Sequence, residues 1–81
     1  MRTNIGTEQL EVAEKTLAEL KKNSSGFPNF ARQVKYTYWK LEDIRGQIDA
    51  DGAITEESEY LIETLMKEVD ELQEEFERIR N

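Results

Sequence analysis

The stretch QIDADGAITEES, residues 47–58, separates two long segments in which apolar residues recur with helical spacing. Asp51 and Gly52 form a dipeptide that is common in turns, and Thr55 can cap the N-terminus of a following helix. A connection this short joins helices that lie side by side and run in opposite directions. The stretch therefore decides the fold, because it predicts that the chain folds back on itself here.

The same stretch has some features of a calcium-binding loop. With Gly52 at the sixth position of such a loop, Asp49 and Asp51 occupy two positions that normally supply ligands. The first and twelfth positions, which normally carry carboxylates, are then Gln47 and Ser58. We therefore predict a turn without a metal, and we keep a weakly calcium-responsive module as the third of three hypotheses for function.

Three segments, residues 7–22, 28–48 and 55–80, are each predicted to form an amphipathic helix. Their apolar residues alternate between spacings of three and four, which places them on one stripe of a helix. In the second and third segments this spacing is heptad-like, as in coiled coils. The three stripes consist of Leu10, Ala13, Leu17 and Leu20; of Phe27, Phe30, Val34, Thr37, Leu41, Ile44 and Ile48; and of Ile62, Leu65, Val69, Leu72, Phe76 and Ile79.

Local signals indicate where these helices begin and end. Thr7 is the expected N-cap of the first helix, and NSSG at residues 23–26 is an expected flexible break after it. Gly46 lies inside the second stripe and is expected to weaken that helix by about 1 kcal/mol relative to Ala. The sequence thus predicts an all-α fold with one helical domain over residues 1–81. We expect a long antiparallel helical hairpin, a shorter N-terminal helix against it, and coiled-coil-like packing of the three.

The composition argues against several kinds of site. The chain has 81 residues with no Cys and no His, so it lacks disulfides, thiolate metal ligands and the usual base of nucleophilic catalysis. It also contains no run of 18 apolar residues, the length needed to cross a bilayer. We expect a soluble, cytoplasmic protein that is not an enzyme and needs no cofactor or metal.

The net charge of −7 is unevenly distributed along the chain. Residues 1–54 carry equal numbers of acidic and basic side chains, whereas residues 55–81 carry ten acidic and three basic ones. Nucleic-acid binding needs an excess of basic residues that replaces the counterions of the phosphates. We therefore expect neither direct nucleic-acid binding nor binding to an anionic membrane.

The second segment has a face that its apolar stripe does not explain. We take Arg32, Lys35, Tyr36, Trp39 and Lys40 on this face as candidate protein-binding residues, because aromatic and Arg side chains dominate binding hot spots. Three interpretations are open. The first helix covers this face and makes it part of the core, or the face is a homodimer interface or a docking site for another protein, or the aromatic residues are merely exposed.

The third segment offers a second candidate surface, an acidic one. Its residues are Glu63, Glu68, Glu71, Glu74 and Glu75. Such a surface can attract a basic groove of another protein through electrostatic steering. We favour the plainer interpretation, in which these carboxylates keep the protein soluble.

From these observations we expect a small acidic regulator or inhibitor that acts by binding another protein and forms a homodimer. Its size and character are typical of regulators encoded by phages and mobile elements. The alternative is a structural scaffold that assembles through its heptad-like stripes.

Overall fold

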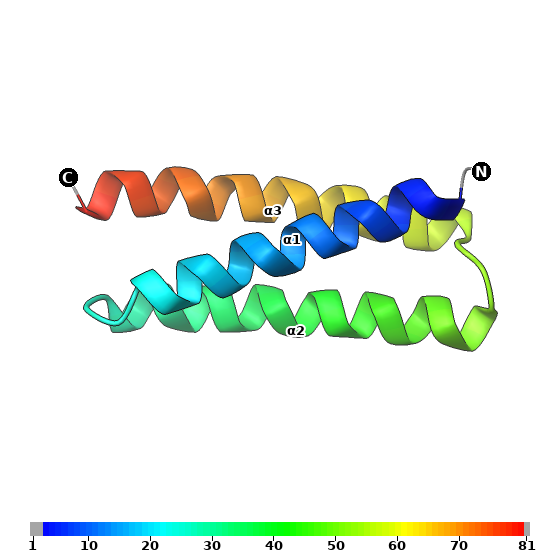
Figure 1. Ribbon diagram of the computed structural model, residues 1–81, viewed down its shortest axis with the longest axis horizontal. Coiled ribbons are helices and arrows are strands. Elements are labelled where there is room, and N and C mark those ends of the chain that lie inside the picture. The colour runs from blue at the N-terminus through cyan, green and yellow to red at the C-terminus, as the bar shows by residue number, and fades with distance from the viewer. Residues whose placement is uncertain (1–2, 81) are drawn as a thin grey trace.

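The computed structural model describes the backbone of residues 3–80 and the side chains from residue 7 to residue 80 (Figure 1). Three helices, α1 (Thr3–Asn23), α2 (Pro28–Asp51) and α3 (Glu56–Arg80), pack against one another in all three pairs. They form an elongated all-α bundle with dimensions of 41 × 19 × 16 Å. None of these helices is both long enough and apolar enough to span a membrane.

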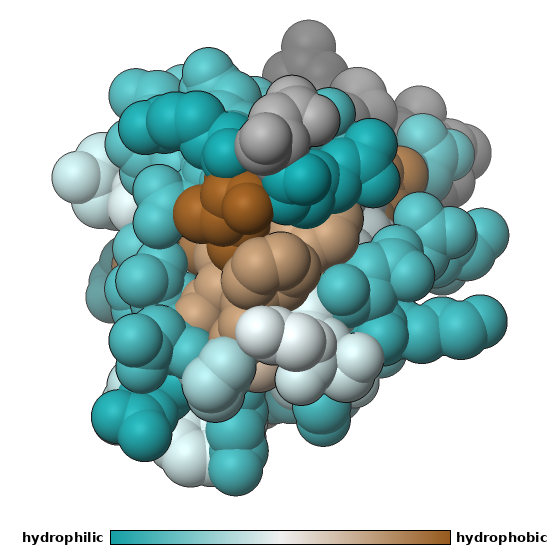
Figure 2. Space-filling view, turned by 90° about the vertical axis from the view of Figure 1, so that its left-hand side faces the viewer, coloured by the Kyte–Doolittle hydropathy of each residue, from teal (hydrophilic) through white to brown (hydrophobic). Residues whose placement is uncertain are grey.

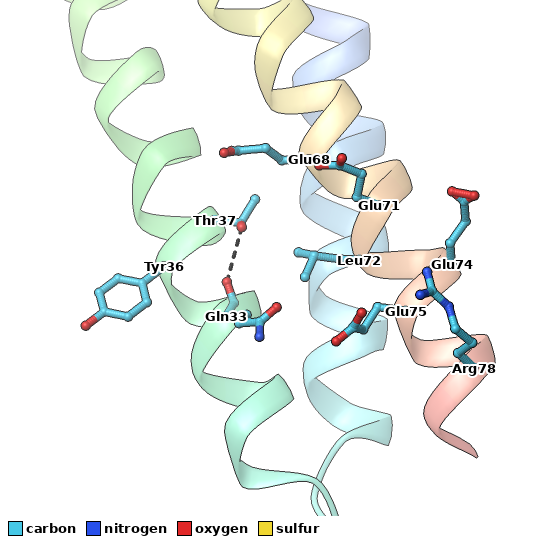
Figure 3. A pocket seen from close by; sticks show the side chains of 9 residues that line it. All are labelled: Gln33, Tyr36, Thr37, Glu68, Glu71, Leu72, Glu74, Glu75 and Arg78. Atoms are coloured by element: carbon cyan, nitrogen blue, oxygen red, sulfur yellow. Dashed lines mark hydrogen bonds between the residues drawn. The ribbon is translucent and has the colours of Figure 1, made fainter. Parts of the chain in front are cut away.

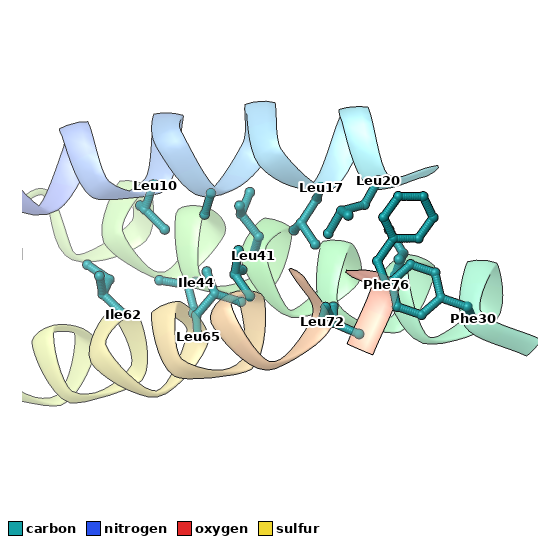
Figure 4. Close-up of a cluster of buried hydrophobic side chains, with 13 residues drawn as sticks. Leu10, Leu17, Leu20, Phe30, Leu41, Ile44, Ile62, Leu65, Leu72 and Phe76 are labelled. Carbon is teal, nitrogen blue, oxygen red and sulfur yellow. The ribbon is translucent and has the colours of Figure 1, made fainter. Parts of the chain in front are cut away.

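The core lies along the centre of the bundle, where the apolar stripes of the three helices meet (Figure 4). It contains 13 buried apolar side chains among those described, and all of them belong to the predicted stripes. Phe27 and Ile48 are partly buried at the ends of the α2 stripe. Ile79 was expected to be buried but is 38% exposed. The reason is its position in the last turn of α3, which reaches past the ends of the other two helices (Figure 1).

The first helix is longer than its sequence signals indicate. Because α1 begins at Thr3, Thr7 lies inside it, and the prediction that Thr7 is the N-cap is wrong. With 21 residues, α1 is only slightly shorter than α2 with 24 and α3 with 25. It packs against both of them along its length, so the three helices are nearly equal members of one bundle.

The turn between α1 and α2 is held by several hydrogen bonds, although it was expected to be a flexible break. The buried Ser24 donates a hydrogen bond from its hydroxyl to the carbonyl of Lys21 at 3.0 Å. The backbone N–H of Phe27 then donates to the carbonyl of Ser24 at 2.9 Å. Pro28 begins α2, where a missing N–H removes no helical hydrogen bond.

Aromatic rings pack beside this turn. The ring of Phe76 at the end of α3 stacks on Phe30, with centroids 5.4 Å apart, and meets Phe27 edge-to-face at 6.2 Å. Figure 2 views this end of the bundle and shows apolar surface surrounded by hydrophilic side chains. The rings thus close the core where the regular helix packing ends.

The turn between α2 and α3 is shorter than expected, because α2 continues through Gly46 and ends at Asp51. Gly52 takes a left-handed conformation with φ of 75°, and its N–H donates to the carbonyl of Ile48 at 2.9 Å. Asp49 and Asp51 therefore lie in the last turn of a helix, so the open ligand loop of a calcium site is not formed. No cluster of three metal-ligating side chains occurs in the part of the chain that the structure describes.

Thr55 caps α3, as predicted, and it does so together with Ser58. The N–H of Ser58 donates to Oγ1 of Thr55 at 3.1 Å, while the N–H of Thr55 donates to Oγ of Ser58 at 2.7 Å. This reciprocal pair is a capping box in which Ser takes the place of the usual Glu or Gln. It satisfies two backbone donors at the point where the chain reverses.

Gly46 inside α2 and Gly52 just after its end provide a matched test of this turn, because neither has a neighbouring atom within 4 Å of an added Cβ. Gly46→Ala is expected to raise the free energy of unfolding by about 1 kcal/mol, since Ala is the better residue inside a helix. Gly52→Ala is expected to lower it by about 1 kcal/mol, since the left-handed conformation disfavours a side chain. Urea unfolding followed by circular dichroism measures both, and two changes of the same sign would contradict the described end of α2.

Candidate protein-binding surface

The side of α2 that points away from the core carries two aromatic side chains in contact. Tyr36 is 56% exposed and Trp39 is 53% exposed. Their rings meet edge-to-face with centroids 5.7 Å apart, and Nζ of Lys35 lies 5.3 Å from the centre of the Trp39 ring. Arg32 joins these three residues around a small hollow of about 200 Å³. We call Arg32, Lys35, Tyr36 and Trp39 the outer α2 face.

The exposure of this face contradicts one of the three interpretations of the sequence. The first helix does not cover Tyr36 and Trp39, because the apolar stripe of α1 packs on the stripes of α2 and α3, away from the outer α2 face. Lys40 was predicted to belong with them, but its Nζ forms an ion pair with Oε1 of Glu68 on α3 at 2.7 Å. It therefore links α2 to α3 instead of flanking the aromatic pair.

One groove runs between α2 and α3, and it has a volume of about 540 Å³ (Figure 3). We call it the acidic groove, because four of the five predicted acidic residues line it; Glu63 does not. Leu72 points into the groove from α3, and Glu75 and Gln33 point toward each other across it (Figure 3). Its lining consists of Gln33, Tyr36 and Thr37 from α2 and of Glu68, Glu71, Leu72, Glu74, Glu75 and Arg78 from α3.

A second groove, of about 740 Å³, runs between α1 and α2 on the opposite side of the outer α2 face. We call it the basic groove, because three lysines, Lys21, Lys22 and Lys35, line it together with one carboxylate, Glu42. The apolar part of its lining comes from Leu17, Ala18, Val34, Tyr38 and Trp39. The sequence signal for it was weak, since Lys21 and Lys22 are equally explained by the favourable placement of cations at a helix C-terminus.

A polar network that the sequence did not reveal joins α1 to α2. Arg45 donates two hydrogen bonds to the carboxylate of Glu14, at 2.9 Å and 3.2 Å, and the hydroxyl of Tyr38 donates to the same carboxylate at 3.3 Å. Arg45 also lies 3.7 Å from a carboxylate oxygen of Glu42. The only sequence signal was that Glu14, Tyr38 and Arg45 each lie next to a stripe residue.

This network shifts the pKa values of its members. The two hydrogen bonds from Arg45 lower the pKa of Glu14, although partial burial opposes the shift. Burial raises the pKa of Tyr38, and the negative charge of Glu14 raises it further. The hydrogen bonds to Glu14 also raise the pKa of Arg45. These charges are paired with one another, so the network holds helices together and presents no free acid or base.

Comparison with protein-family models, with curated proteins and with solved structures finds no match for this chain. The exposed aromatic pair and the two oppositely charged grooves are therefore the basis on which we propose a function.

The Glu14 network gives a pH-dependent prediction. Because the folded protein lowers the pKa of Glu14 below 4.5, the contribution of its ionised form is complete above pH 4.5 and is lost as the pH falls through the lowered value. Glu14→Gln is expected to lower the free energy of unfolding at pH 7 by up to about 1 kcal/mol, the upper range for ion pairs this exposed. The difference from wild type is expected to shrink in acid.

Urea unfolding at pH 7 and at pH 2.5 measures this difference. Glu11→Gln is the matched control, since Glu11 is exposed on α1 and forms no ion pair within the described residues. An effect of Glu14→Gln that is as large at pH 2.5 as at pH 7 would show that charge is not the cause.

Proposed function

We propose that this protein is a small non-enzymatic regulator, of the kind encoded by phages and mobile elements, that inhibits or modulates another cytoplasmic protein by binding it. The outer α2 face is the binding site. The observation that carries the proposal is the contact between Tyr36 and Trp39, which are more than half exposed and yet already ordered against each other.

The energetics of binding favour such a pair. Trp, Tyr and Arg are the residue types most enriched among binding hot spots. Each aromatic ring offers a large apolar area whose burial contributes about 25 cal/mol per Å². The contact between the rings, together with Lys35 above Trp39, reduces the rotational freedom that the side chains still have to lose on binding. The bundle itself gains little from leaving these groups in water.

The chemistry of the chain supports binding over catalysis. Without His or Cys, the chain lacks the usual general base and the most reactive nucleophile. The Glu residues of the acidic groove line an open surface, not the enclosed pocket that separates the pKa values of catalytic carboxylates. The net charge of −7 disfavours nucleic acid and anionic membranes as partners.

The scaffold alternative has less support. We retain a long α2–α3 hairpin with coiled-coil-like packing as part of the proposal, because both stripes follow heptad-like spacing. However, the apolar stripes of all three helices are buried against one another within one chain. They are therefore occupied, and an open-ended assembly would need a different surface.

Affinity capture from a lysate of the natural host, followed by mass spectrometry, tests the proposal. The wild-type chain is expected to retain a discrete protein partner. Trp39→Ala is expected to lose it while remaining folded, because Trp39 lies outside the buried core and its contacts with Tyr36 and Lys35 contribute only about 1 kcal/mol. Tyr60→Ala is the matched control, since Tyr60 is 68% exposed on α3 and lies outside the outer α2 face. It is expected to retain the partner.

Circular dichroism and thermal unfolding of all three proteins establish that the variants are folded. Recovery of no partner by the wild type, or of the same partner by Trp39→Ala, would refute the proposed site.

A further inference from the structure

Opposite charges lie on the two sides of the outer α2 face. Tyr36 lines both the small hollow and the acidic groove, whereas Trp39 lines both the hollow and the basic groove. The two aromatic residues therefore form the border between a groove that α2 shares with α3 and a groove that it shares with α1.

Most of these charges have no partner of opposite charge among the side chains that the structure describes. Within residues 7–80, no carboxylate lies within 4 Å of the charged nitrogen of Lys21, Lys22 or Lys35, and no cation lies within 4 Å of the carboxylates of Glu71, Glu74 and Glu75. The lysines of the basic groove cannot pair with the glutamates of the acidic groove within one chain, because α2 lies between them. Both sets are exposed apart from the half-buried Glu75, and each is available to a partner of opposite charge.

We infer that the occupant of the outer α2 face is a second copy of this chain, bound so that the acidic groove of each copy lies over the basic groove of the other. This inference rests on the proposed function in one respect, because it uses the same binding surface: the second copy and the target protein compete for the outer α2 face, and the target binds the monomer. A two-fold dimer suits the arrangement, since one pair of complementary patches is then used twice. The aromatic pairs of the two copies meet at the centre, where burial is most complete.

The positions of the grooves also set the orientation of the two copies. If the two-fold axis runs parallel to α2, the α3 side of one copy lies over the α1 side of the other, and opposite charges meet. If the axis crosses α2 at a right angle, acidic groove lies over acidic groove and basic over basic. The first arrangement makes the two α2 helices parallel, and it is the one that the charges favour.

The dimer needs nearly a whole side of the bundle. A standard interface covers about 800 Å² of each partner, and the bundle is 41 Å long and 19 Å wide, so both grooves have to be covered together with the outer α2 face. Two charges oppose the pairing, namely Glu42 in the basic groove and Arg78 in the acidic groove. Glu42 lies 3.7 Å from Arg45, which reduces its effect on the three lysines.

Sedimentation equilibrium of the full chain over a range of micromolar concentrations tests the inference. The wild type is expected to show a reversible monomer–dimer equilibrium whose dissociation constant rises with salt, because salt screens the groove charges. Lys35→Glu and Glu71→Lys are each expected to raise the dissociation constant at least about tenfold, because like charges then meet twice in each homodimer. Lys67→Glu is the matched control, since Lys67 lies on α3 outside both grooves and is expected to leave the constant unchanged.

An equal mixture of Lys35→Glu and Glu71→Lys is expected to dimerise about as well as the wild type. In the mixed dimer, one interface half joins Glu at position 35 to Lys at position 71, and the other half retains the wild-type charges. Loss of packing in either variant cannot produce this recovery. No recovery in the mixture, a wild type that remains monomeric, or assembly beyond a dimer would each overturn the inference.

Spin labels on single cysteines at Asn29 and Asp43 test the orientation, since these positions lie seven residues before and after Tyr36. Parallel α2 helices bring equivalent labels together at both ends. An antiparallel pair centred on Tyr36 separates them by about 20 Å along the helix axis, from a rise of 1.5 Å per residue, and would overturn the parallel arrangement.

The dimer and the proposed function fail separately. If the wild type remains monomeric but captures a host protein through Trp39, the dimer is refuted and the proposed function stands. If the wild type dimerises as described but captures no protein, the proposed function is refuted and the dimer stands.

Discussion

The left-handed backbone conformation of Gly52 is the constraint on which the arrangement of this bundle depends. It ends α2 at Asp51, and only four residues later the capping box of Thr55 and Ser58 begins α3. So short a connection makes α2 and α3 antiparallel neighbours and turns their apolar stripes toward each other. The opposite side of α2 then has no partner within the hairpin. The exposure of Tyr36 and Trp39 thus follows from where α2 ends, together with the packing of α1 on the apolar stripes.

The Glu14–Arg45 contact plays the corresponding part for α1. The hydrophobic attraction between apolar stripes has little directional preference. A helix can therefore shift along its neighbours with little loss of buried apolar area. A carboxylate that accepts two hydrogen bonds from one guanidinium has a fixed geometry and therefore resists sliding. This contact favours the position of α1 along the bundle in which Lys21, Lys22 and Lys35 line one groove.

The sequence was sufficient for properties that depend on local spacing, and insufficient for properties that depend on how helices are placed together. Period-3.6 spacing identified every buried apolar residue among those that the structure describes, because burial in a bundle follows the stripe. The predicted burial of Ile79 was wrong, because the end of α3 has no helix opposite it. The predicted N-cap at Thr7 was wrong, because a Thr can cap a helix but can equally lie inside one. The partners of Glu14 and Lys40 lie on other helices, and no spacing within one segment can show them.

The outer α2 face also contains the only tryptophan of the chain, Trp39. Indole emission depends on contact with water, and this indole is already 53% exposed in the folded monomer. Unfolding of the core therefore changes the surroundings of the fluorophore far less than coverage of the outer α2 face does. In this protein, tryptophan fluorescence is a direct reporter of what lies against α2 and a poor reporter of whether the bundle is intact.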